Sequence, residues 1–168
     1  MKLDLHTHCH EAVSFADPDI ELVRKIVLAV KGRGLDGIAI TEHDTSDFAY
    51  EVKELVECFF GGEILIIPGQ EVREDHHQIV ELYLSNNLTF RFVAHPGYIS
   101  DTYYLLDDIH GLEIENAHYH IDKQKVKKVA RRHRLLLLSN SDAHSLSEIG
   151  KYYNEIDVRA LEHHIKYR

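Results

Sequence analysis

The sequence predicts a single α/β domain, residues 1–168, built around a largely parallel sheet. Short β-rich apolar runs alternate along the chain with stretches of helical periodicity, a pattern typical of strand–helix–strand units. The 168 residues, 44% of them hydrophobic, are enough for one sizeable core, and no repeat or linker divides them. Residue types that bind metals recur directly after the apolar runs, which suggests a site at one edge of the sheet.

Seven strands are predicted from the apolar runs. In chain order they are KLDLH (residues 2–6), DGIAIT (36–41), EILIIPG (63–69), QIVELYL (78–84), FRFVAH (90–95), GLEIEN (111–116) and LLLLSN (135–140). The connections over residues 73–76 and 85–89 are too short to hold a crossover helix between parallel strands. We therefore expect the sheet or barrel to be irregular at these two places.

Two longer helices are marked by caps and by apolar spacing. The first begins with Asp17 as its N-cap and Pro18 as its first residue, and ends at Gly32. The second runs from about Ser46 to Phe60 and is followed by a glycine pair. Each places its apolar residues on one face, so both should pack against the sheet.

Two further helices are expected in the second half of the chain. One spans roughly residues 122–133. Ser145 and Glu148 have the spacing of a capping box, which predicts a short helix directly behind the last strand.

The charge balance bears on the partners of the protein. With 28 acidic and 19 basic residues the formal net charge is −9, which argues against binding nucleic-acid duplexes or anionic membranes. Fourteen histidines, many of them near acids, favour divalent cations instead. Only Cys9 and Cys58 carry thiols, and we expect a cytoplasmic protein because no secretory leader or membrane-length apolar run is present. The sequence does not predict an oligomeric state.

Polar motifs follow the predicted strands. His6 and His8 project to the same side at the end of the first strand, about 6.6 Å apart along the backbone at roughly 3.3 Å per residue. The later strands end in TEHD, GQEV, AHPG, EIENAHYH and SNSDAH. Taken singly, each of these residues could be a helix cap, a turn residue or an ordinary core histidine. Because ligands bind at the carboxyl ends of parallel strands, the whole set predicts a metal site.

The motifs DLHTH, ITEHD, PGQEV, AHPG, EIEN and SNSDAH, in this order, closely resemble the polymerase and histidinol phosphatase (PHP) family. The resemblance extends from residue 3 to about residue 150. It implies a distorted seven-stranded (β/α)7 barrel that holds two or three divalent ions. It also implies hydrolysis of phosphate esters, the activity of the family's active members.

The resemblance implies the ligands of two of the ions. The first ion would be held by His6, His8, Glu71 and Asp142. Glu71 would bridge to a second ion, which His95 and a histidine after the sixth strand would also bind. His120 fits the family spacing best for this last position, and His118 is the alternative.

A third ion would be held by His43, His144 and a residue soon after the first histidine pair. Here the sequence departs from the common pattern, which places an acid or a histidine five or six residues after the pair, because these positions hold Val13 and Ser14. We expect Glu11 to fill the position, since Asp17 is explained as a helix cap. His10 is an alternative because strand alternation would point it the same way as His8.

Such a site suits phosphate hydrolysis, because bound metals lower the pKa of a water from 15.7 toward 7 and neutralise the phosphoryl oxygens. The ligand types would accept zinc, manganese or iron. Arg73 could hold the substrate phosphate and His77 could assist the leaving group, although either could also be a solvated surface residue. The expected substrate is a small phosphomonoester or a nucleotide phosphate. A silent PHP scaffold and an amidohydrolase that cleaves carbon–nitrogen bonds remain the alternatives.

Overall fold

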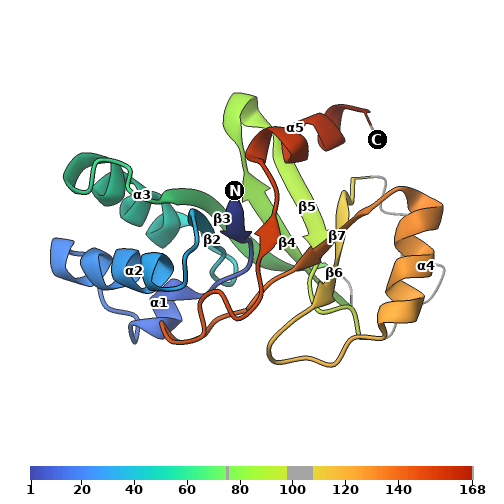
Figure 1. Ribbon diagram of the computed structural model, residues 1–168, viewed down its shortest axis with the longest axis horizontal. Helices are drawn as coiled ribbons and strands as arrows, with labels where there is room; N and C mark the ends of the chain where they lie inside the picture. Colours follow the sequence, from blue (N-terminus) through green and yellow to red (C-terminus); the bar gives the residue numbers. More distant parts are fainter. Residues whose placement is uncertain (75, 98–107, 168) are drawn as a thin grey trace.

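The computed structural model describes residues 1–74, 76–97 and 108–167 (Figure 1). Its centre is an eight-stranded sheet with the order β7-β6-β5-β4-β3-β2-β1-β8. The strands are β1 (Lys2–Asp4), β2 (Gly37–Ile40), β3 (Leu65–Glu74), β4 (His77–Tyr83), β5 (Thr89–Val93), β6 (Gly111–Glu115), β7 (Leu136–Ser139) and β8 (Asn154–Glu155).

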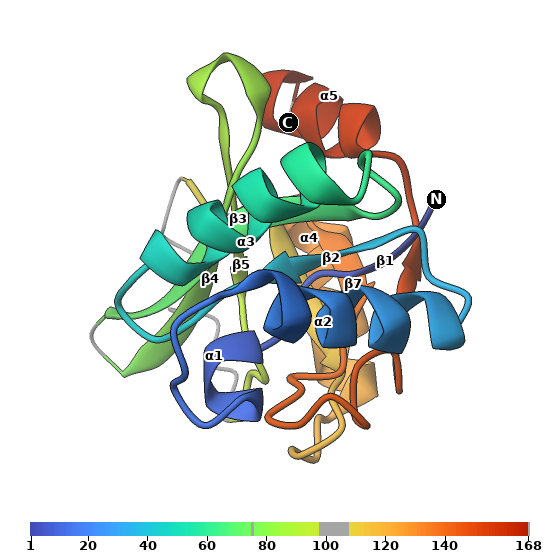
Figure 2. The same cartoon turned by 90° about the vertical axis from the view of Figure 1, so that its left-hand side faces the viewer.

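The helices cover the outside of this sheet. They are α1 (Cys9–Ala12), α2 (Ile20–Gly32), α3 (Asp47–Phe59), α4 (Lys123–His133) and α5 (Val158–Tyr167), with a 3-10 turn, η1, at Ser85–Asn87. Helices α2 and α3 lie side by side across the β1–β3 half, as Figure 2 shows, whereas α4 covers β6 and β7 on the other side of the molecule. Helix α5 packs against β5.

Strand direction changes in the middle of the sheet. Strands β1, β2 and β3 are parallel to one another, and so are β5, β6 and β7. Strand β4 runs antiparallel to both β3 and β5, so the two short connections are hairpin turns. The predicted irregularity is therefore present, and its reason is that a connection of a few residues can join antiparallel strands only.

The fold class is confirmed at the level of an α/β, barrel-like sheet. All seven predicted strands are present, but an eighth, β8, pairs antiparallel with β1, so the sheet is not a simple ring of seven β/α units. Among the described residues no α-helix lies in the β3–β4 or β4–β5 connection, and the second of these holds only the 3-10 turn η1. Alternating β/α units are thus replaced by a meander in this part of the chain.

The first and last motifs meet where the sheet nearly closes. The backbone N–H of Asp142 donates to the carbonyl of His6 at 2.9 Å, and the N–H of His8 donates to the carbonyl of Ala143 at 2.9 Å. Thr7 and Ala143 form a parallel bridge between these hydrogen bonds. The chain after β7 therefore runs beside the chain after β1, although the two segments are separated by most of the sequence.

Three layers of apolar residues hold the sheet. One lies between the sheet and the helices α2 and α3, where Ile26, Ile38 and Val52 are fully buried. The second fills the inside of the sheet, with Leu5 and Phe92 fully buried. The third lies between α4 and β6. Burying such side chains contributes roughly 1.5–3 kcal/mol each, so these layers are the main stabilising element of the fold.

Two details of the predicted helices are corrected. The N-cap of α2 is Asp19, not Asp17: the Asp19 side chain accepts a hydrogen bond from the N–H of Leu22 at 2.7 Å. The segment behind the last strand forms turns rather than a helix, because the Glu148 side chain accepts from the His144 N–H at 3.3 Å and the chain turns back at once. The one-turn helix α1, strand β8 and helix α5 were not predicted.

None of the helices in the described ranges is both long enough and apolar enough to span a membrane.

Candidate metal centre

The carboxyl ends of the strands bring four buried side chains to one point. The Nε2 atoms of His6 and His8 lie 3.2 Å apart. Asp142 Oδ1 lies 3.4 Å from the first of these atoms and 3.2 Å from the second. The carboxylate of Glu71 completes the group, 3.6 Å from each Nε2. All four side chains are almost completely inaccessible to solvent.

The spacing of these atoms fits a metal ion. Ligands that bind at roughly 2.0–2.1 Å in tetrahedral geometry are about 3.3 Å from one another. The five distances above scatter around this value, and each imidazole directs a nitrogen rather than a carbon at the shared point. Two imidazole nitrogens facing each other next to two carboxylates form a donor set that a divalent cation would satisfy.

Glu71 lies between this group and two further histidines. Its Oε1 is 3.2 Å from Nε2 of His95, and its Oε2 is 3.2 Å from Nδ1 of His43. Glu71 is in the middle of the long strand β3, directly beside His43 through a parallel bridge. Its two oxygens thus face four histidines from three different strand ends, which is the geometry required of a bridging carboxylate.

A second group of donors adjoins the first. Donor atoms of His8, Glu11, His43 and His144 all lie within 4.8 Å of one another. Glu11 is 3.7 Å from Nε2 of His43 and 3.7 Å from Nε2 of His144, one distance for each carboxylate oxygen. Nδ1 of His144 donates to the backbone carbonyl of Asp142 at 2.8 Å, which leaves Nε2 directed at Glu11. The structure therefore brings the predicted third set together.

Helix α1 explains why Glu11, and not His10, is in this group. The chain turns into a helix directly after His8, so the alternation of a strand no longer applies to residue 10. The ring of His10 instead stacks on Phe48 at 4.4 Å, away from the donor atoms. The buried carboxylate of Glu42 accepts from the N–H of His10 at 2.7 Å and so anchors the start of α1.

Three further polar residues of the site, Glu113, Asn116 and Asn140, were not predicted to have a role. Glu113 Oε1 accepts from Nδ1 of His6 at 3.2 Å and from Asn140 Nδ2 at 2.8 Å. Asn116 Nδ2 donates to Glu113 Oε2 at 2.9 Å and to Asp142 Oδ2 at 3.1 Å. These contacts orient two of the candidate ligands. The signal was present in the EIEN motif, whose glutamate at 113 alternates inward on β6.

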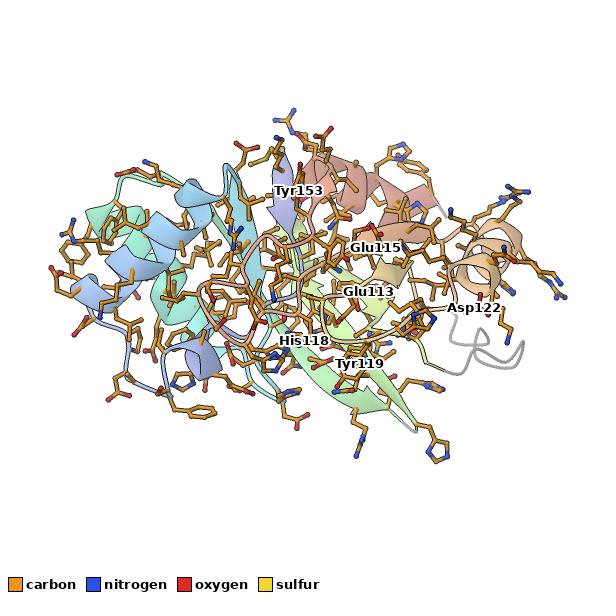
Figure 3. The ribbon with its side chains drawn as sticks, turned by 60° about the horizontal axis from the view of Figure 1, so that its bottom comes forward. Glu113, Glu115, His118, Tyr119, Asp122 and Tyr153 are labelled. Atoms are coloured by element: carbon orange, nitrogen blue, oxygen red, sulfur yellow. The ribbon has the colours of Figure 1, made fainter. Side chains whose placement is uncertain are left out.

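The histidines after β6 are placed differently from each other. The ring of His118 lies 5.5 Å from that of His144, and its Nε2 is 3.6 Å from Glu148 Oε1. His120 is exposed and lines a separate hollow of about 730 Å³ with Tyr119 and Tyr152. Figure 3 shows His118 and Tyr119 next to each other in the segment after β6, close in this view to Glu113. Both histidines are exposed, and His118 is the one whose ring contacts a candidate ligand, His144.

Arg73 and His77 lie at the edge of the site. Arg73 is exposed and, with His43 and Glu71, lines a small hollow of about 190 Å³. His77 lines another hollow, of about 70 Å³, with His95. Both residues are on the β3–β4 hairpin, beside the candidate ligands but outside the donor groups themselves.

The protonation behaviour of the centre follows from its burial and its charges. Burial opposes ionisation of Glu71, but hydrogen bonds from His6 and His95 outweigh burial and hold its pKa well below the ordinary value. The pKa of Asp142 is lowered in the same way, against burial, by His8 and His6. Burial also disfavours a charged His6, yet Glu113 raises its pKa, whereas burial lowers the pKa of His8. The centre therefore favours positive charge, which a proton or a metal cation can supply.

Backbone strain accompanies the site. His95 and Asp142 have φ angles of 24° and 53°, and Asp44, next to His43, has a φ of 56°. Non-glycine residues in this region cost roughly 1–3 kcal/mol each and persist where surrounding contacts hold them. Here the hydrogen bond from the His95 N–H to Glu113 Oε2, at 2.6 Å, is one such contact.

Comparison with known proteins agrees with this description. The family described as PHP-associated matches residues 120–162. An uncharacterised protein of Methanocaldococcus jannaschii is 33% identical over 95 residues, which is 52% of this chain and 53% of that protein. The match therefore spans about half the length of that relative.

Three solved structures share the fold at low sequence identity. One, from Bifidobacterium adolescentis, is a proposed metal-dependent phosphoesterase with a TM-score of 0.75, 15% identity and 96% of each chain covered. PsfC from Pseudomonas syringae has a TM-score of 0.68 at 17% identity, with 89% of this chain and 78% of that one covered. An amidohydrolase from Chromobacterium violaceum, with sulfate bound, has a TM-score of 0.66 at 15% identity, with 98% of this chain and 97% of that one covered.

Fold and site together define an α/β protein of barrel-like shape with a candidate metal centre at its strand ends. The PHP-associated match over residues 120–162 confirms the resemblance that the motifs predicted, and the solved structures show that the fold is shared.

Proposed function

We propose that the chain is a metal-dependent phosphoesterase that hydrolyses a small phosphomonoester or a nucleotide phosphate. The observation that carries the proposal is the position of Glu71, whose two oxygens face His6, His8, His43 and His95. A carboxylate in this position can be shared by two cations, and paired cations suit displacement at phosphorus. The fold shared with a proposed metal-dependent phosphoesterase supports the assignment.

The donor groups would hold two or three divalent ions. His6, His8, Glu71 and Asp142 would form one site, Glu71 and His95 would contribute to a second, and Glu11, His43 and His144 to a third. Zinc, manganese and iron are compatible with this mixture of imidazole and carboxylate ligands. Bound there, such ions would provide the Lewis acidity that activates a water and neutralises the phosphoryl oxygens.

The residues of the chain itself have three tasks in this reaction. Glu113 orients the His6 ring through its Nδ1, and the carbonyl of Asp142 does the same for His144. Arg73, beside His43, can donate a fork of hydrogen bonds to a phosphate. His77, beside His95, can give a proton to the leaving oxygen.

The hollow lined by Tyr119 and His120 could accommodate an organic leaving group of moderate size. It has a volume of about 730 Å³ and shares Asn116 and Tyr119 with the surroundings of the centre. The Tyr119 ring stacks on His95 at 4.1 Å and joins the hollow to the candidate ligands. A small phosphomonoester or a nucleotide would fit a hollow of this volume.

A second candidate function is hydrolysis of carbon–nitrogen bonds. The likeness to the Chromobacterium violaceum amidohydrolase over nearly the full length of both chains favours it. A related donor set can serve either reaction, since both need an activated water and charge stabilisation. A silent scaffold is disfavoured because the donor positions are filled by residues that can bind metal.

The deciding experiment is a substrate panel on metal-saturated protein. Manganese-loaded chain would be assayed with an aryl phosphate, small phosphomonoesters, nucleoside monophosphates, phosphodiesters and cyclic amides, with Asp142→Asn as the control. We expect phosphate release that chelation and Asp142→Asn abolish. Cleavage of amides without phosphate release would replace the proposal by an amidohydrolase, and no turnover on any substrate would support the scaffold.

A further inference from the structure

The positive charges of this acidic chain are concentrated in one segment. Residues 123–134, helix α4 and the residue that follows it, hold seven of the 19 lysines and arginines and no acidic residue. They are Lys123, Lys125, Lys127, Lys128, Arg131, Arg132 and Arg134. The segment thus carries a formal charge of +7, and the rest of the chain carries −16. The net charge of −9 conceals this separation.

The packing of α4 directs these charges outward. Val126, Val129 and Ala130 form the buried face of the helix and lie in the apolar layer against β6. At the start of the helix, acids neutralise part of the charge: Lys123 pairs with Glu115. The remaining cations toward the end of α4 extend away from the sheet on the solvent side.

Three of the cations line one hollow. Lys127, Arg131 and Arg134 surround a space of about 470 Å³ whose other walls come from Ala130, the start of β7 at residues 135–137, and His164 of α5. Lys127 and Arg131 are one turn apart on the same helix face. Arg134 follows the last helical residue in the left-handed conformation, with φ 55° and ψ 40°.

These three cations line the hollow without a close ion pair, and Lys127 interacts with Glu115 only at longer range. Within the ranges that the structure describes, no carboxylate lies within 4 Å of any of them, whereas Arg91 elsewhere in the chain has three such partners. The partial negative charge at the helix end, about −0.5, offsets only a fraction of three full charges. A multivalent anion in the hollow would relieve this repulsion.

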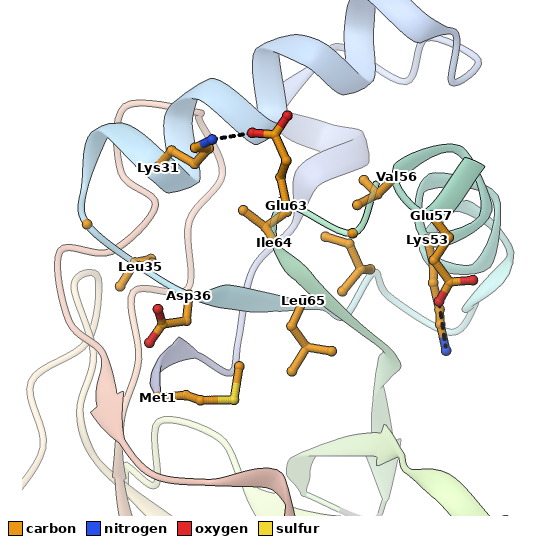
Figure 4. A pocket seen from close by; sticks show the side chains of 13 residues that line it. Met1, Lys31, Leu35, Asp36, Lys53, Val56, Glu57, Glu63, Ile64 and Leu65 are labelled. Atoms are coloured by element: carbon orange, nitrogen blue, oxygen red, sulfur yellow. Dashed lines mark hydrogen bonds and ion pairs between the residues drawn. The ribbon is translucent and has the colours of Figure 1, made fainter. Parts of the chain in front are cut away.

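A hollow beside the other half of the sheet differs in this respect. It has a volume of about 650 Å³ and lies at the amino ends of β2 and β3 (Figure 4). Its lysines are paired: Lys31 with Glu63, and Lys53 with Glu57 at 3.9 Å. Unpaired positive charge is therefore a property of the hollow beside α4, not of every depression on this surface.

We propose that the hollow beside α4 binds the di- or triphosphate group of a small organic ligand. Two guanidinium groups and one ammonium offer donors that match phosphate oxygens, and arginine binds such oxygens in a bidentate manner. Leu137, which is 40% exposed, provides an apolar wall for the organic part of the ligand. The site lies at the start of β7, whereas the candidate metal centre follows the end of this strand. It is therefore a second site and not part of the metal centre.

Calorimetric titration with inorganic tripolyphosphate tests the site. The titration uses the full chain in metal-free buffer, because divalent ions would themselves bind the probe. We expect binding to one site, weakened about tenfold in Arg131→Gln, as loss of a charge-assisted hydrogen bond implies. The matched control is Lys128→Gln, which removes the same charge from the same helix outside the hollow and should change the affinity less than twofold. Both variants, loaded with manganese, should keep the wild-type rate on an aryl phosphate.

Three results would overturn the proposal. The first is absence of binding in the wild type. The second is equal weakening by Arg131→Gln and Lys128→Gln, which would mean a diffuse field around α4 rather than a built site. The third is a single-stranded oligonucleotide that binds more tightly than tripolyphosphate and depends equally on both residues, which would assign the whole outer face of α4 to nucleic acid. Retention of the wild-type melting temperature in both variants excludes misfolding as the cause of any loss.

Discussion

Glu113 on β6 accepts a hydrogen bond from Nδ1 of His6 at 3.2 Å, although 107 positions separate the two residues in the sequence. The contact fixes the ring so that Nε2 points at His8 and Asp142. A carboxylate behind a ligating histidine sets its tautomer and raises its basicity. The position of Glu113 on β6 therefore influences how strongly His6, after β1, can bind a metal ion.

The first prediction concerns this pair. Glu113→Gln should weaken metal binding about 10–100-fold, because the amide cannot replace the carboxylate behind His6. The control is Glu115→Gln, two residues further along the same strand, whose side chain contacts Ser139 and Lys123 instead. Metal titration of both variants checks the prediction. Equal affinities for the two variants would contradict the role given to Glu113.

The second prediction separates the roles of Glu71 and His43. Glu71 contacts both donor groups, so Glu71→Gln should lose more bound metal than His43→Ala and nearly all activity. His43→Ala should retain a core of ions at His6, His8 and Asp142, with some turnover and a higher KM. Elemental analysis and kinetics on both variants provide the measurement. The ligand assignment would fail if His43→Ala lost every ion while Glu71→Gln lost none.

The third prediction distinguishes His118 from His120. The ring of His118 lies 5.5 Å from that of His144, whereas His120 is exposed in the neighbouring hollow. His118→Ala should therefore lower metal content and kcat, and His120→Ala should change mainly the KM for substrates that occupy the hollow. Metal analysis and steady-state kinetics on both variants check this. If His120→Ala lowered the metal content and kcat while His118→Ala did not, His120 would be the ligand.

The fourth prediction is a stability change on metal removal. A ligand present at 100 times its Kd stabilises the folded state by about 2.7 kcal/mol, which for a chain of this size corresponds to a rise of about 5–10 °C in Tm. Chelated protein should therefore melt lower than metal-saturated protein in a thermal scan. Asp142→Asn should show little of this difference. Equal Tm values with and without saturating metal in the wild type would argue against a metal centre.

The fifth prediction is a pH dependence of stability from Asp4. This carboxyl is fully buried, and burial raises its pKa from 3.8 to about 6, against hydrogen bonds from Ser141 and Gly150. The folded chain then holds a proton that the unfolded chain releases, so the contribution of Asp4 to stability is complete below pH 3.8 and is lost as the pH rises to about 6. The loss is on the order of 3 kcal/mol.

Urea unfolding of chelated wild type and Asp4→Asn at about pH 4.5 and 6.5 measures this contribution. We expect the variant to lack the Asp4 part of the pH dependence, so the stability difference between the two proteins should change with pH. Parallel behaviour of both proteins over this range would show that Asp4 titrates normally in the folded state.

The sequence by itself determined the strands and most of the candidate ligands. Apolar runs bounded by polar motifs identify buried strands because burial on both sides excludes polar residues from their middle. The rule that ligands lie at the carboxyl ends then placed residues as distant as His6 and Asp142 in one site. The two short connections likewise predicted irregular pairing.

The other features of the site and of the helix ends could not be predicted, because they depend on contacts between segments far apart in the chain. Nothing local shows that residues 9–12 turn into a helix, which moves His10 onto Phe48 and Glu11 toward His43. The cap at Asp19 in place of Asp17 depends on where the chain after α1 enters α2. The hydrogen bond between His6 and Glu113 likewise forms only when β6 lies close to β1. Local propensity does not determine how close two distant strands lie.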